Sequence, residues 1–61
     1  MNWETIAIYK MSKENDKVIF QKNADSRYLI TDQKINKTWL ANTKQARNIW
    51  TEYQGKGYKK V

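Results

Sequence analysis

Apolar and polar side chains alternate in short runs along the first two thirds of the chain. The runs cover residues 3–11, 17–22, 27–31 and 35–41, and polar, turn-like segments separate them. Runs rich in β-branched and aromatic residues, spaced by such turns, are typical of antiparallel strands joined by hairpins. The pattern therefore predicts a meander of three or four strands, of which the fourth is shorter.

The first predicted strand has apolar side chains on both of its faces. Ile6 and Ile8 share one face, whereas Ala7 and Tyr9 share the other. Strands that are apolar on both faces are more often central than peripheral. We therefore expect this strand to lie inside the sheet.

The segment 43–55 has the spacing of a helix. Its apolar side chains recur at i, i+3, i+4 and i+7, which is one helical face, at Ala46, Ile49, Trp50 and Tyr53. The pattern predicts an amphipathic helix that closes the chain.

Residues at both ends of this segment favour helix caps. Asn42 is a good N-cap residue, and Gln45 stands where its partner in a capping box belongs. At the other end, Gly55 or Gly57 supplies the left-handed residue that ends a helix. Tyr58 is then expected to fold back onto the helix as the hydrophobic contact after the cap.

Together these elements predict one α+β domain over residues 1–61, with the helix packed on one face of an antiparallel meander. The predicted core consists of the larger apolar side chains: Trp3, Ile6, Ile8, Val18, Phe20, Leu29, Ile30, Trp39, Leu40, Ile49, Trp50 and Tyr53. A chain of this length buries only about 60% of its unfolded surface. It contains no Cys and no His, so the core lacks the support of a disulfide or of the usual zinc ligands.

The residue types argue against catalysis. Imidazole bases and thiolate nucleophiles are absent, and Glu14 and Asp16 lie in a polar turn between lysines. The run Gly55-Lys56-Gly57 follows the predicted helix, whereas a phosphate-binding P-loop precedes one. We therefore predict a binding module that is not an enzyme and uses no cofactor and no metal.

The positive charge is concentrated in the second half of the chain. The net charge is +6; residues 1–32 carry five basic and five acidic side chains, and residues 33–61 carry seven basic and one acidic. This asymmetry favours an acidic partner for the second half. A Lys-rich chain with many Asn and Ile is also what an AT-rich genome encodes, so a merely solvated surface is the competing interpretation.

Basic side chains alternate with aromatic ones in this half, which is the general footprint of a small nucleic-acid-binding protein. Lysines favour contact with the phosphate backbone over the reading of bases. The predicted nucleic-acid contacts are Lys34, Lys37, Lys44, Arg47, Lys56, Lys59 and Lys60.

The alternative is a protein-interaction module, such as an accessory or regulatory subunit or a phage-like inhibitor of a larger machine. Its partner would present an acidic protein surface, and its contacts would be aromatic, because Trp and Tyr dominate binding hot spots. The candidates are Trp3, Tyr9, Tyr28 and Tyr58. The sequence leaves the oligomeric state open.

The longest apolar runs are three residues, whereas a membrane-spanning helix needs about 20. No basic start followed by an apolar run marks a secretory signal. We therefore expect a soluble, cytoplasmic protein that does not bind a membrane.

The C-terminal third also resembles a known group of sequences. The pattern Ala46-Arg47 followed by Trp50, and then Gly57-Tyr58, is similar to the ending of a family of short uncharacterised cyanobacterial proteins. That family has no assigned activity, so the resemblance implies a helix closed by a Gly-aromatic pair and no particular chemistry.

Overall fold

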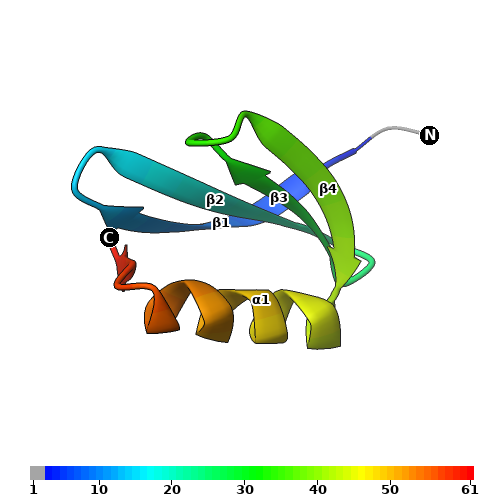
Figure 1. Cartoon of the computed structure of the whole chain (residues 1–61). Helices are drawn as coiled ribbons and strands as arrows, with labels where there is room; N and C mark the ends of the chain where they lie inside the picture. Colours follow the sequence, from blue (N-terminus) through cyan, green and yellow to red (C-terminus); the bar gives the residue numbers. More distant parts are fainter. Residues whose placement is uncertain (1–2) are drawn as a thin grey trace.

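A computed structural model describes residues 3–61 as one antiparallel sheet and one helix (Figure 1). The elements in chain order are β1 (Thr5–Lys13), β2 (Asp16–Asn23), β3 (Arg27–Asp32), β4 (Lys37–Asn42), α1 (Thr43–Gly55) and β5 (Lys59–Lys60). The strands lie in the order β4-β3-β2-β1-β5. The predicted α+β class is confirmed, as is the four-stranded meander followed by a helix, but the sheet has five strands.

The fifth strand is a short return of the chain after α1. Lys60 pairs with Met11 and Lys59 pairs with Ser12, and the Val61 N–H donates to the carbonyl oxygen of Lys10 at 3.0 Å. Two lysines carry no strand pattern, which is why the sequence predicted too few strands. β1 therefore has neighbours on both sides, although β5 covers only its C-terminal end.

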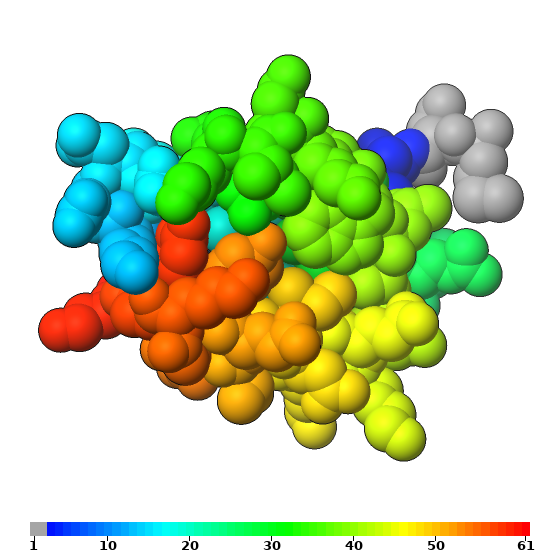
Figure 2. Space-filling model, in the orientation of Figure 1, coloured from blue at the N-terminus to red at the C-terminus, as the bar shows by residue number. Residues whose placement is uncertain are grey.

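Helix α1 covers one face of the sheet, and the molecule has two layers (Figures 1 and 2). The side chains between the layers form the core: Met11, Val18, Phe20, Ile30, Ala41, Ala46, Tyr53 and Tyr58. Trp50 packs against this core, with its ring edge-on to that of Phe20 and 5.1 Å between the centroids. Among residues 3–61, no helix is long and apolar enough to cross a membrane.

Of the predicted core residues, Trp3 and Leu29 are half-buried but lie outside this layer, and three more are mostly exposed. Ile6, Ile8 and Leu40 are 58%, 56% and 59% exposed. Ile8 and Leu40 alternate onto the sheet face turned away from α1, because their strand neighbours pack under the helix. Ile6 lies at a register irregularity between Thr5 and Ala7, which breaks the simple alternation expected for the first strand.

The two ends of α1 are fixed by local hydrogen bonds. At the start, the Gln45 N–H donates to Asn42 Oδ1 at 2.8 Å, and the Asn42 N–H donates to Gln45 Oε1 at 3.1 Å. This reciprocal pair is the predicted capping box. It begins the helix directly after β4 and so requires no connecting loop.

The helix ends in a Schellman motif built on Gly57. Its φ is +99°, its N–H donates to the Gln54 carbonyl at 3.1 Å, and the Tyr58 N–H donates to the Tyr53 carbonyl at 3.0 Å. The rings of Tyr53 and Tyr58 then meet edge-on, with centroids 5.1 Å apart. Of the two glycines considered, Gly57 is the left-handed residue, and Tyr58 folds back as expected.

We predict that alanine has opposite effects at the two glycines. At Gly57 the left-handed backbone costs a side chain about 1–2 kcal/mol, and the added Cβ would meet Lys13 Cε at 3.3 Å. At Gly55 an added Cβ meets nothing within 4 Å, so Gly55→Ala should gain about 0.5–1 kcal/mol. Urea unfolding followed by Trp fluorescence measures both values. Equal shifts for the two variants would contradict the assignment of Gly57 as the cap.

Candidate nucleic-acid interface

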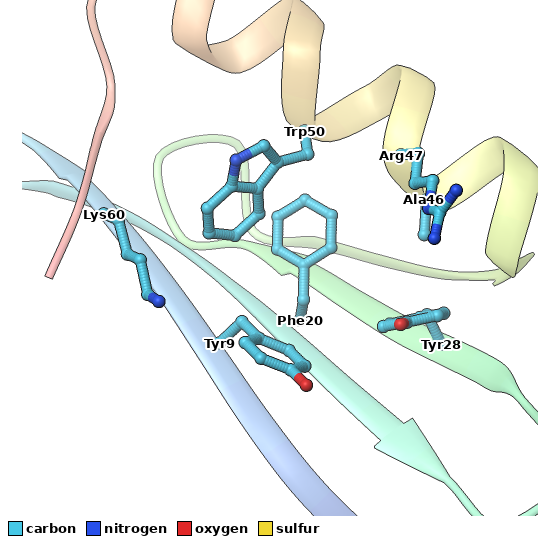
Figure 3. A pocket seen from close by; sticks show the side chains of 7 residues that line it. All are labelled: Tyr9, Phe20, Tyr28, Ala46, Arg47, Trp50 and Lys60. Atoms are coloured by element: carbon cyan, nitrogen blue, oxygen red, sulfur yellow. The ribbon is translucent and has the colours of Figure 1, made fainter.

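A hollow of about 190 Å³ lies between α1 and the sheet on the side of β1 (Figure 3). We call it the aromatic groove and define it by its lining residues: Tyr9, Phe20, Tyr28, Ala46, Arg47, Trp50 and Lys60. Three neighbouring strands supply its floor, α1 supplies one wall, and β5 supplies the residue at its outer end. The groove is therefore assembled from segments that are far apart in the sequence.

Strand pairing brings the floor aromatics together. Tyr9 of β1 lies opposite Phe20 of β2. Tyr28 of β3 lies opposite Lys22, which is two residues from Phe20 on β2 and therefore on the same face. Phe20 is buried, so it shapes the groove without offering contact area. Tyr9 is 38% exposed, and Tyr28 is half-buried, so these rings remain accessible to a ligand.

The charged residues of the groove are all basic. Arg47 on α1 and Lys60 on β5 are exposed and stand on opposite sides of the aromatic cluster in Figure 3. Within the part of the chain that the structure describes, no Asp or Glu lines this hollow. The half-buried Lys22 lies next to Tyr28 across the strands and on the same face. The sequence does not single out Lys22, because acidic residues elsewhere in the first half balance its charge.

The structure brings only two of the seven predicted basic contacts to the groove. Lys34 and Lys56 line a different cleft at the end of α1. The others are exposed on separate elements: Lys37 at the start of β4, Lys44 in the first turn of α1 and Lys59 in β5. The positive half of the sequence therefore does not form one patch in space.

The cleft at the end of α1, of about 520 Å³, has a mixed charge. It collects three lysines and three carboxylates: Lys13, Lys34, Lys56, Glu14, Asp16 and Asp32. Lys34 Nζ lies 3.7 Å from the Asp16 carboxylate, and Lys13 Nζ donates to the Lys56 carbonyl at 2.6 Å. Because these opposite charges offset each other, this charged cleft attracts a polyanion less than the aromatic groove does.

Asp32 joins the sheet to the helix inside this cleft. The Tyr53 hydroxyl donates to its Oδ2 at 2.6 Å, and the Lys34 N–H donates to its Oδ1 at 3.0 Å. Burial, helped by the adjacent carboxylate, raises the pKa of Tyr53 well above its ordinary value. The sequence indicates Asp32 only as a turn former, because its partner lies on an element that follows much later.

The four aromatics of the alternative, protein-binding prediction are also separated. Tyr9 and Tyr28 line the aromatic groove. Trp3 is half-buried just before β1, where its Nε1–H donates to Thr5 Oγ1 at 2.7 Å. Tyr58 is only 6% exposed and packs on Tyr53, so it stabilises the helix end and offers no contact surface.

No protein-family model, no curated protein and no solved structure matches this chain. The resemblance of residues 43–58 to the short cyanobacterial proteins therefore stays a prediction. Function has to be inferred from the chemistry of the groove.

We predict that Tyr53→Phe lowers the free energy of unfolding by about 1–3 kcal/mol at neutral pH, because the buried Asp32 carboxylate loses a donor. The raised pKa also gives a pH dependence. The neutral hydroxyl is favoured in the folded state, so its contribution is complete below the unfolded tyrosine pKa of about 10 and declines as the pH rises further.

Urea unfolding at several pH values between neutral and strongly alkaline tests this prediction. The wild-type chain should lose stability above pH about 10 more steeply than Tyr53→Phe does. Tyr9→Phe, on a more exposed ring, is the matched control and should follow the wild type. Parallel curves for wild type and Tyr53→Phe would contradict the assigned role.

Proposed function

We propose that the chain is a non-catalytic module that binds single-stranded nucleic acid at the aromatic groove. One observation carries this proposal: accessible aromatic rings, Arg47 and Lys60 line the same hollow. Among residues 3–61, no carboxylate lines it. Nucleic acid offers both complementary groups, a phosphate backbone and flat bases.

The cations supply an attraction that does not depend on base sequence. Lys and Arg neutralise phosphates and release their counterions, which makes the affinity fall as salt rises. The net charge of +6 adds a general attraction for polyanions. Arg47 and Lys60 lie on either side of the rings, so a strand that crosses the groove would place its phosphates near both.

The aromatic floor supports single strands over duplexes. The hollow of about 190 Å³ is of the size that receives one small ring system, since a cavity of about 150 Å³ holds benzene. A base in a duplex is stacked and paired, so its faces cannot reach Tyr9 or Tyr28. Stacking on such rings contributes about 1–3 kcal/mol per base and tolerates any base.

The groove chemistry also supports binding without turnover. Its lining contains no carboxylate among residues 3–61, and the chain has no His and no Cys. In the same described range, no group of three His, Cys, Asp or Glu side chains is placed to hold a metal ion. The groove itself therefore offers neither a general base nor a thiol nucleophile, and Arg47 and Lys60 contribute positive charge.

We expect saturable binding of short single-stranded DNA or RNA that weakens steeply between about 50 and about 200 mM salt. Trp50 lines the groove, so tryptophan fluorescence reports the titration without a label. Arg47→Gln and Lys60→Gln should each weaken binding and lower the slope of log affinity against log salt by about 0.7.

Lys34→Gln is the matched control for these two variants. It removes the same charge, but from the charged cleft, where Lys34 faces Asp16. It should change the affinity and the slope much less. Absence of binding at the lower salt concentration, or equal effects of all three variants, would overturn the proposal.

The stacking contribution is tested separately at Tyr9. Tyr9→Ala should cost about 1–3 kcal/mol of single-strand affinity and leave the salt slope unchanged, because a ring and not a charge is removed. Tyr9→Phe keeps the ring and should bind like the wild type. If Tyr9→Ala binds normally, the bases do not stack on the floor of the groove.

A further inference from the structure

The sheet face turned away from α1 remains uncovered by any element of residues 3–61 (Figure 1). Alternation along each strand identifies the side chains on this open face, since their immediate neighbours pack under the helix. Its apolar members are Ile8, Ile19, Leu29 and Leu40, and its charged members are Lys10, Lys17, Arg27 and Lys59.

The apolar side chains form a stripe across the meander. Strand pairing places Ile8 opposite Gln21, Gln21 opposite Leu29, and Leu29 opposite Leu40. Ile19 lies on the same face, two residues along from Gln21. Ile8 and Leu40 are more than half exposed, and Ile19 and Leu29 are half-buried. Contiguous apolar patches at the surface of a small protein are typical of interaction sites.

The charges on this face have one sign. Lys59, Ser12 and Lys17 are successive partners across β5, β1 and β2, and Lys10 is the next residue of β1 on the same face. Arg27 stands toward the other end, opposite Asn42. Among the strand positions of residues 3–61 that alternate onto this face, none is Asp or Glu.

A count of charges along the sequence does not reveal this arrangement. The first half of the chain is neutral in total, yet Asp16 and Asp32 line the charged cleft on the helix side of the sheet. The open face consequently keeps lysines and an arginine without their acidic counterparts. The folded structure thus separates charges that are balanced along the sequence.

We propose that the open face is a docking surface for an acidic protein partner that presents an apolar patch bordered by carboxylates. Protein interfaces commonly join an apolar centre to a polar rim, which is the arrangement of this stripe and its cations. Opposite charge on the partner would steer the encounter and fix its register. This surface lies on the other side of the sheet from the aromatic groove, so occupancy of one leaves the other free.

Three other occupants fit the face less well. A second copy would place four positive side chains against four more, which is unfavourable. A single-stranded nucleic acid would find an aliphatic centre with one aromatic ring beside it, that of Trp3, which is linked through Thr5 to Gln21, whereas the aromatic groove offers several stacking rings. An anionic membrane would have to bury the Gln21 amide and the Thr31 and Thr38 hydroxyls in lipid, which adds no hydrogen bond to those they make with Thr5 and with each other, whereas a protein can add further ones.

A peptide-display selection tests the proposal without a known partner. Random short peptides are selected on the full wild-type chain after depletion on the double variant Ile8→Thr and Leu40→Thr. Both positions are more than half exposed, so the variant should keep the wild-type thermal unfolding curve. We expect the enriched peptides to combine Asp or Glu with large apolar residues.

Individual peptides are then measured against three variants. The double Thr variant and Lys17→Glu should each lose affinity by about tenfold or more, which is the effect expected of an interface centre and of a reversed charge. Leu40→Met, which keeps the apolar volume, should bind normally. Backbone amide shifts in an NMR titration should map to β1–β4 on the open face and persist when single-stranded DNA is present.

Several results would overturn the proposal. One is an enriched peptide set without acidic bias, and another is binding that is insensitive to Ile8→Thr with Leu40→Thr. Sedimentation with phosphatidylglycerol vesicles that depends on those same residues would assign the face to a membrane. A dimer in sedimentation equilibrium that the double variant dissociates would assign it to a second copy.

Discussion

The layer of side chains between α1 and the sheet is the interaction on which the rest of the structure depends. A chain of 61 residues without disulfides has apolar material for one such layer, in which Met11, Phe20 and Ile30 are the largest fully buried side chains. One helix covers one face, so the opposite face stays open, and the helix leaves part of the sheet uncovered beside β1, where the aromatic groove forms. Both candidate binding surfaces therefore arise because a single helix is too small to cover the whole sheet.

Local signals predicted the helix most fully. The spacing of Ala46, Ile49, Trp50 and Tyr53 and the polar cap at Asn42 depend only on near neighbours, and the helix occupies the segment in which they place it. The return strand β5 escaped prediction, because its pairing uses backbone groups and its lysines carry no strand signal. The burial of Ile8 and Leu40 was predicted wrongly for a related reason. Alternation reveals that a face is apolar but does not reveal whether another layer covers it.

The sequence predicted several residues of the candidate site, but it did not predict that they lie together. Arg47 and Lys60 were selected for charge and Tyr9 for its ring, under two different hypotheses, and only strand pairing brings them to one groove. Lys10 and Lys17 were overlooked because counting along the chain cancels them against nearby acids. The two faces of a sheet differ in charge because of the alternation along each strand and the pairing between strands. A count of charges along the chain takes account of neither.

The short reach of β5 has a consequence for the behaviour of the protein at high concentration. β5 pairs with β1 only at Met11 and Ser12. The N-terminal part of β1, which begins at Thr5, therefore has an outer backbone edge that β5 does not cover. Such edges are templates on which other chains add as further strands. The register irregularity between Thr5 and Ala7 interrupts the regular ladder there, and the charged Lys10 follows it. These two features protect the molecule against runaway polymerisation through its own sheet.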